Sequence, residues 1–174
     1  KNDRIQVFGK DGKQIAAWGK TGVEPGEFKA PAGLAIDAQD RLYVTEIGND
    51  RVQVFDKDGK FVKEQRIKPK TLGDGAVWDI AFSKDAAQKY IFLADGKNER
   101  VYVIDRQSLA VITQFGDGGR QPGQFFAVHS IATDSKGNLY TTETYEGKRL
   151  QKFAYKGMKA VAKNQGVVWP GRYK

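Results

Sequence analysis

The segment PAGLAIDAQDRLYVTEIGNDRVQVF, residues 31–55, decides the fold because the chain repeats its pattern later as VHSIATDSKGNLYTTETYEGKRLQKF, residues 128–153. Each copy has a run of small and apolar residues, a polar turn, a second apolar run and a third run that opens with an arginine. Residues 79–104 hold a further copy between these two. The arginines that open the third runs are separated by 47, 49 and 49 residues and are Arg4, Arg51, Arg100 and Arg149.

A unit of this length with several short apolar runs predicts a four-stranded antiparallel blade of a β-propeller. Within each run apolar and small or polar residues alternate, as in β-strands, and the three-and-four spacing of helices is absent. Asp-Gly pairs at 11–12 and 58–59 predict tight hairpins between third and fourth strands. We expect an all-β, single partial propeller domain over residues 1–174, with about three and a half blades: a half blade at 1–19 and blades at 31–67, 77–115 and 128–168.

Four motifs carry a family resemblance. They are the PGxF crossings PGEF (25–28) and PGQF (122–125), the first strand GLAID, the second strand LYVTE and the third strand NDRVQVF. Together they resemble the NHL repeat, and the chain is similar to the propellers of the peptidyl-α-hydroxyglycine α-amidating lyase and gluconolactonase-like group. The resemblance implies a six-bladed ring of which this chain is one part. Upstream blades before Lys1 or self-association of copies would complete it.

The composition describes a soluble, basic chain with a formal net charge of +8. It contains no cysteine, which excludes disulfides and thiolate chemistry, and no apolar run long enough for a membrane span. Basic residues are mostly interspersed with acidic ones, which favours a solvated basic surface, and the densest cluster is Arg66–Lys70. RNA or polyanion binding by a basic face stays open as an alternative. No signal peptide is visible in the chain, and the resemblance implies a periplasmic or extracellular location.

Strand order places the candidate site residues on one rim. In a meander, the start of strand one, the end of strand two and the start of strand three lie at the same end of the blade. Propeller ligands commonly occupy the channel mouth at such a rim. Trp78 and Tyr145 replace the Ala32 and Gly48 of their columns, which favours a ligand-stacking surface or core packing. The candidate ligand-binding residues are Trp78, Arg100, Glu143, Tyr145 and Arg149.

The acidic and basic residues of this rim recur once per blade, as Glu46, Asp95 and Glu143 and as Arg51, Arg100 and Arg149. Such regular recurrence favours an architectural role, in which each carboxylate pairs with the guanidinium of its own blade or bonds the loop backbone. Direct ligand contact is the alternative for Arg100, Glu143 and Arg149.

His129 is the only histidine and opens the first strand of the last blade. The resemblance implies a metal role, because VHSIA at 128–132 is similar to the HSLA-like context in which the amidating-lyase branch coordinates a metal. Ala32 and Trp78 hold the equivalent places, so further ligands would come from unseen blades or nearby carboxylates. The cofactor would then be a divalent metal, Zn or Ca. A histidine packed and hydrogen-bonded at the channel is the competing interpretation.

Three functions follow from these observations. The first is a propeller that binds a small molecule, peptide or protein at the rim. The second is a metal-dependent lyase or hydrolase of the amidating-lyase or lactonase-like type, and the third is RNA or polyanion binding. The sequence nominates no catalytic residue, since it has neither a G-x-S-x-G nucleophile elbow nor a recognisable catalytic triad.

Overall fold

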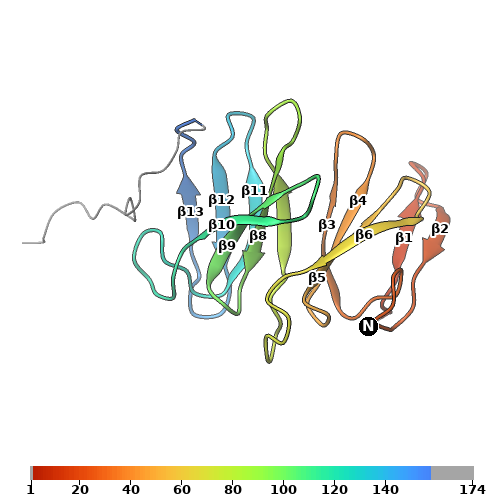
Figure 1. The fold of residues 1–174 in the computed structure, drawn as a ribbon, viewed down its shortest axis with the longest axis horizontal. Helices are drawn as coiled ribbons and strands as arrows, with labels where there is room; N and C mark the ends of the chain where they lie inside the picture. Colours follow the sequence, from red (N-terminus) through yellow and green to blue (C-terminus); the bar gives the residue numbers. More distant parts are fainter. Residues whose placement is uncertain (1, 158–174) are drawn as a thin grey trace, which may run out of the picture.

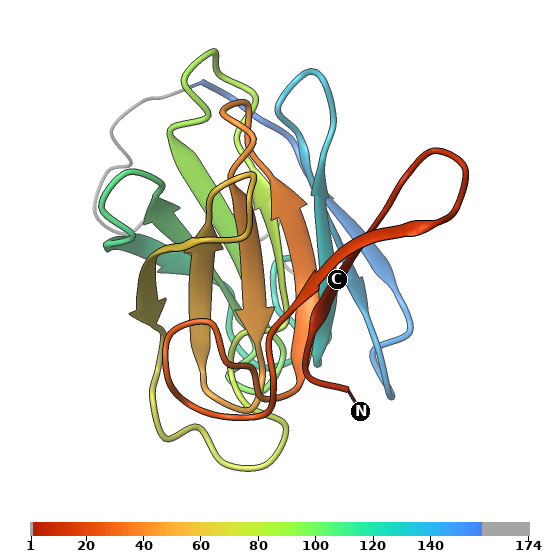
Figure 2. The same cartoon turned by 90° about the vertical axis from the view of Figure 1, so that its right-hand side faces the viewer.

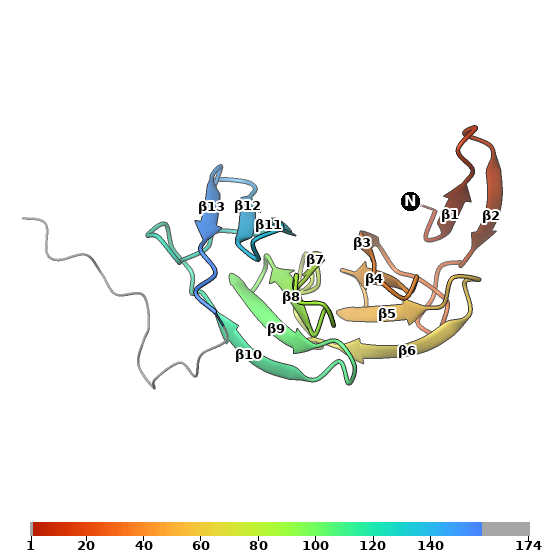
Figure 3. The same cartoon turned by 90° about the horizontal axis from the view of Figure 1, so that it is seen from above.

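The computed structural model describes residues 2–157, which form 13 strands in four antiparallel sheets. The sheets stand side by side along an arc, which Figure 3 shows from above and Figure 1 from the side. Figure 2 views the arc from the end at which the first hairpin stands. This arrangement confirms the prediction of an all-β chain made of propeller blades. In chain order the strands are β1 (Ile5–Phe8), β2 (Gln14–Trp18), β3 (Pro31–Ile36), β4 (Leu42–Glu46), β5 (Arg51–Phe55), β6 (Phe61–Arg66), β7 (Asp79–Phe82), β8 (Tyr90–Asp95), β9 (Arg100–Asp105), β10 (Val111–Phe115), β11 (Val128–Thr133), β12 (Leu139–Glu143) and β13 (Leu150–Phe153).

Each sheet is a meander of consecutive strands, in the order β1-β2, β3-β4-β5-β6, β7-β8-β9-β10 and β11-β12-β13. The Asp-Gly pairs close the β1–β2 and β5–β6 hairpins, where Gly12 and Gly59 have φ of 77° and 81°. Glycine adopts this left-handed conformation without steric cost, which is why the tight turns fall there. The part of the predicted last blade beyond residue 157, up to residue 168, lies outside the described residues.

The two PGxF crossings have the same conformation and bury the same side chain. Thr21 pairs with Phe28 and Gly118 with Phe125 in short parallel bridges, and both phenylalanines are fully buried. An added Cβ at Gly19 would come within 2.4 Å of the Phe28 ring, so this glycine is needed for close approach to the ring. The buried phenylalanines anchor each crossing beneath the blade that follows it.

The cores lie between neighbouring sheets. One cluster joins the β3–β6 and β7–β10 sheets through side chains such as Tyr43, Val54, Ile80 and Leu93. A second joins β7–β10 to β11–β13, and a third packs β1 and β2 against β4 and β5. Burial on both faces explains why the inner strands read as nearly continuous apolar runs.

One face of β3 is open. Leu34 and Ile36 are 57% and 65% exposed, although their counterparts Ile80 and Phe82 in the next sheet are 4% and 7% exposed. Leu34 pairs directly with Val44 and therefore shares its face, toward the β1–β2 sheet. That sheet has only two strands, which cover β4 and β5 but leave β3 uncovered. The described residues thus contain two outer strands of a blade without its inner pair.

Candidate functional site

The strand register places the predicted residues on one rim. Glu46 pairs with Pro31 and Arg51, Asp95 with Arg100, and Glu143 with Val128. First-strand entrances, second-strand ends and third-strand starts therefore meet at the same end of each sheet, as the meander predicts. We call this end the entrance rim.

The entrance rim carries a cavity of about 210 Å³ between the last two sheets. Trp78, which precedes β7, and Tyr145, which follows β12, both line it. Trp78 is 6% exposed and forms a wall of the cavity, whereas Tyr145 is 58% exposed. The other lining residues are Asp74, Gly96, Lys97, Glu99, Phe126 and Ala127. The cavity therefore combines aromatic surface with side chains of both charges.

The indole of Trp78 is fixed from two sides. Its Nε1–H donates to the carbonyl oxygens of Gly75 at 2.8 Å and Asp74 at 3.2 Å. Its ring meets the imidazole of His129 edge to face, with 5.3 Å between the ring centroids. His129 is exposed, and its Nδ1 lies 3.2 Å from the hydroxyl of Ser130. The rings of Trp78, just before β7, and His129, in β11, thus form one continuous aromatic surface on the entrance rim.

Asp79, adjacent to Trp78, is a half-buried carboxylate at the point where three first strands converge. Its Oδ2 accepts from the backbone N–H of Ile131 in β11 at 3.1 Å, and its Oδ1 accepts from Ile80 at 2.9 Å. A Cβ added at Gly33 of β3 would lie 2.7 Å from Asp79 Oδ1. Burial raises the pKa of Asp79, and the two N–H donors and the nearby His129 oppose this rise.

Sequence reasoning missed Asp79, although a signal was present. Its column holds Gly33 and Ser130 in the other blades, so the aspartate breaks its column in the same way as Trp78 does. Asp79, Gly33 and Ser130 each follow directly after the first-strand position at which Trp78, Ala32 and His129 stand.

Glu143 and Arg149 bond each other and the crossing beneath them. Arg149 Nε donates to Glu143 Oε1 at 2.7 Å, and its Nη groups reach carbonyl oxygens of the 119–124 crossing, including that of Gln124. Glu143 Oε2 also accepts from the backbone N–H of Phe126 at 3.2 Å. These contacts favour the architectural interpretation for the pair. Direct ligand contact by either residue stays a prediction.

Arg51 makes the same clamp on the first crossing. Its guanidinium is fully buried and donates to both oxygens of Glu46, to Glu64 and to carbonyl oxygens of the 23–27 segment. Each clamp therefore ties a PGxF crossing to the third strand of the blade that follows it.

Asp95 and Arg100 bond the loop backbone rather than each other, which is the second of the two predicted architectural alternatives. Asp95 instead accepts from the backbone N–H of Asn98 at 2.9 Å and from its side-chain amide at 2.8 Å. Arg100 Nε donates to the Asn98 carbonyl oxygen. The crossing before this blade lacks a PGxF motif, so the arginine has no matching ring of carbonyls to bind. Burial raises the pKa of Asp95 to about 6, against the hydrogen bonds from Asn98.

The predicted metal ligand His129 has no cluster of partners among residues 2–157, where no three His, Cys, Asp or Glu side chains gather as a metal site would require. Ligation by His129 stays a prediction that depends on groups outside this part of the chain. The basic loop after β6 brings Lys68 and Lys70 beside Lys97, close to the rim cavity. The described chain has no helix with the length and hydropathy that a membrane crossing needs.

Comparisons with known proteins agree with this fold. The profile of a family described as a 6-bladed beta-propeller, DUF5128, matches residues 1–72. Virginiamycin B lyase from Staphylococcus aureus is 16% identical with a TM-score of 0.59 over 90% of this chain and 50% of its own. A Bacteroides caccae protein of unknown function is 15% identical with a TM-score of 0.62 over 84% and 50%. A chain of the nidogen/laminin complex is 18% identical with a TM-score of 0.55 over 86% and 59%.

This chain therefore spans half to three fifths of the length of these three structures. At such identities the likeness establishes the propeller fold, on which many unrelated functions occur.

Proposed function

We propose that this chain is part of a propeller that binds a peptide segment or protein loop at the entrance-rim cavity. The observation that carries the proposal is that Trp78 and Tyr145, the two aromatic residues that break their columns, come from different sheets and line the same cavity. An exposed and a buried aromatic ring that line one cavity offer an apolar contact of the kind that dominates binding interfaces.

The charges around the cavity favour a peptide over a polyanion. Lys97 lies on the same lining as Asp74 and Glu99, so the site offers a cation and two acids within one small surface. Peptides carry N–H donors, carbonyl acceptors and side chains of both charges. A polyphosphate backbone would meet the two acids as well as the lysine, which opposes its binding.

The test compares the chain with two matched variants. A random peptide library is selected against the whole chain, and the selected peptides are measured by fluorescence polarisation. Tyr145→Gly copies Gly48 of the earlier blade and suits the positive φ of 50° at this position, so the fold is kept while the ring is lost. We expect at least tenfold weaker binding. Phe8→Ala removes a similarly exposed ring, 56% against 58%, far from the rim and should leave affinity unchanged. Equal affinity for Tyr145→Gly and the unmodified chain would refute the site.

A second candidate function, a metal-dependent lyase or hydrolase, is favoured by one observation. The exposed imidazole of His129 lies near the half-buried carboxylate of Asp79. Calorimetric titration with Zn²⁺ and with Ca²⁺ tests it, with His129→Ala as the control variant. Stoichiometric binding that the substitution abolishes supports this function, and equal heats from both proteins exclude His129 as a ligand.

A further inference from the structure

The turns opposite the entrance rim form two equivalent crevices between neighbouring sheets, and the two are filled differently. In the first crevice, between β3–β6 and β7–β10, Arg106 inserts between the sheets. Its Nη1 donates to Asp37 at 2.5 Å, and its Nη2 and Nε donate to the carbonyl oxygens of Ala87 and Gln88 at 2.7 and 2.6 Å. The Asp37 side chain is fully buried and also accepts from Tyr43. A polar plug therefore closes this crevice.

The second crevice, between β7–β10 and β11–β13, has lost every part of that plug. The residue equivalent to Asp37 is Ser83, the one equivalent to Tyr43 is Phe92, and the one equivalent to Arg106 is Tyr155. Asp85 in this turn bonds Ser83 and Lys89 of its own turn, and the next blade supplies Tyr155 in place of a guanidinium to join the sheets there. The three exchanges come from two different blades yet fall on one crevice.

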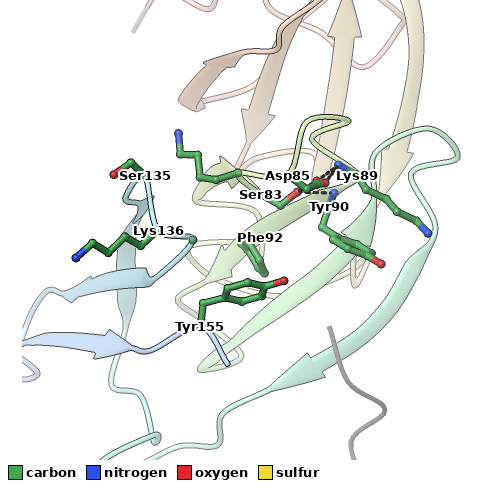
Figure 4. Close-up of a pocket in the computed structure, with 10 residues that line it drawn as sticks. Ser83, Asp85, Lys89, Tyr90, Phe92, Ser135, Lys136 and Tyr155 are labelled. Atoms are coloured by element: carbon green, nitrogen blue, oxygen red, sulfur yellow. Dashed lines mark hydrogen bonds between the residues drawn. The ribbon is translucent and has the colours of Figure 1, made fainter. Parts of the chain in front are cut away.

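The result is a cavity of about 460 Å³. Figure 4 shows Phe92 and Tyr155 at its centre with Tyr90 beside them. The volume falls in the range of small-molecule pockets, which are mostly apolar with a few polar groups at the edge. Aromatic rings on its walls suit a flat ring that can stack or pack edge to face.

Charge at the mouth of this cavity is positive. Lys84, Lys89 and Lys136 contribute to the lining, against one acid, Asp85. The Asp85 carboxylate is occupied by the backbone N–H of Lys89 at 2.9 Å and by the Ser83 hydroxyl at 3.0 Å. Among the described residues, none of these three lysines forms a salt bridge. Lys89 Nζ lies 5.5 Å from the centroid of the Tyr90 ring, and the exposed ammonium groups of Lys84 and Lys136 are available to a bound anion.

We propose that this crevice is a second binding site, distinct from the entrance-rim cavity, for a small planar aromatic anion such as an aromatic carboxylate. The ring occupies the space between Phe92 and Tyr155 that the arginine plug fills in the other crevice. The carboxylate lies at the mouth, within reach of the lysines. The structural basis is the loss of an Arg–Asp–Tyr plug at one of two equivalent places, which leaves an aromatic cavity with a cationic mouth.

The experiment titrates the whole chain with 2-naphthoate and with the neutral 2-naphthalenemethanol, and follows backbone amide shifts by NMR. We expect saturable shifts at Ser83, Phe92 and Gly137, and at least fivefold tighter binding of the anion. Restoring the plug with the double substitution Ser83→Asp/Tyr155→Arg should weaken 2-naphthoate at least tenfold. The matched control Asp37→Ser/Arg106→Tyr alters the other crevice and should leave these shifts in place.

A second variant protects the test against misfolding of the restored plug. Lys84→Glu/Lys136→Glu changes exposed charges alone and should weaken 2-naphthoate while leaving 2-naphthalenemethanol unaffected. Equal affinities for the acid and the alcohol would overturn the anionic part of the proposal. Shifts confined to the open face of Leu34 and Ile36, or unchanged binding in the restored-plug variant, would overturn the site itself.

Discussion

Replacing the buried clamp Arg51 by methionine should destabilise the chain far more than the same change at Arg100. Both arginines open the third strand of a blade, so backbone position and strand are matched. Arg51 is fully buried and bonds Glu46, Glu64 and the 23–27 carbonyls, whereas Arg100 donates to the Asn98 carbonyl oxygen in its own turn. The pair of substitutions therefore isolates the contribution of the clamp.

The magnitude follows from the interactions that each substitution removes. Removing one partner of a buried ion pair costs about 4 kcal/mol, because the remaining carboxylate stays buried without its counter-charge. Losing the neutral-acceptor bond of Arg100 costs about 1 kcal/mol. With a urea dependence of about 2 kcal/mol per molar, the unfolding midpoint should fall by about 2 M for Arg51→Met and about 0.5 M for Arg100→Met. Tryptophan fluorescence and circular dichroism in urea measure both.

Two further measurements sharpen this prediction. Adding Glu46→Gln to Arg51→Met should recover part of the loss, since it removes the uncompensated carboxylate. Amide hydrogen exchange should accelerate at Gly22 and Phe28, whose N–H groups bond within the crossing. Equal midpoints for Arg51→Met and Arg100→Met would refute the reasoning, because the clamp would then contribute nothing beyond an ordinary strand-end bond.

The remaining predictions concern pH and backbone strain. The pKa of Asp95 in the folded chain is raised to about 6 from 3.8. Its contribution to stability is therefore full below pH 4 and falls by about 3 kcal/mol in all as the pH rises toward 6. Asp95→Asn should remove this pH dependence of the urea unfolding midpoint. Asp134 has the opposite sign, because hydrogen bonds lower its pKa to about 2, so Asp134→Asn should remove a loss of stability between pH 4 and pH 2. Gly75→Ala should lower the thermal midpoint strongly, since φ is +67° and the new Cβ would lie 2.0 Å from the Ile47 carbonyl oxygen. Gly12→Ala, with φ +77° and open space around it, should cost only about 1 kcal/mol; similar losses for the two glycines would contradict the steric argument.

The fold could be predicted because its signals are local and repeated. Alternating apolar runs, Asp-Gly turns and an arginine at each third strand recur at a constant spacing, and register follows from them. For Asp95 and Arg100 the sequence left two alternatives, an ion pair or bonds to the loop backbone, and the second is formed. Asn98, three residues after the aspartate, donates its backbone and side-chain N–H groups to Asp95, and its carbonyl oxygen accepts from Arg100.

The site was only partly predictable because cavities depend on convergence between blades. Trp78 and Tyr145 were found by their departure from a column, and the structure brings them to one cavity. The crevice at the opposite end of the sheets could not be predicted from the sequence. Ser83, Phe92 and Tyr155 are common residue types, and only the packing of two blades brings them to one cavity. A residue that differs from its equivalents in the other blades becomes informative when it is compared with the residues that it contacts in the next blade.

The arginine clamps also affect the order in which the chain can take shape on the ribosome. Arg51 is translated 24 residues after Glu27, whose carbonyl oxygen it binds. At bacterial and eukaryotic elongation rates this interval is on the order of seconds. Until then the loop has no donor for its inward carbonyls and stays hydrated. Each of the two clamped crossings is therefore secured only after the start of the third strand of its own blade has been made, and we expect a ribosome that stalls before this point to leave the crossing accessible to proteases.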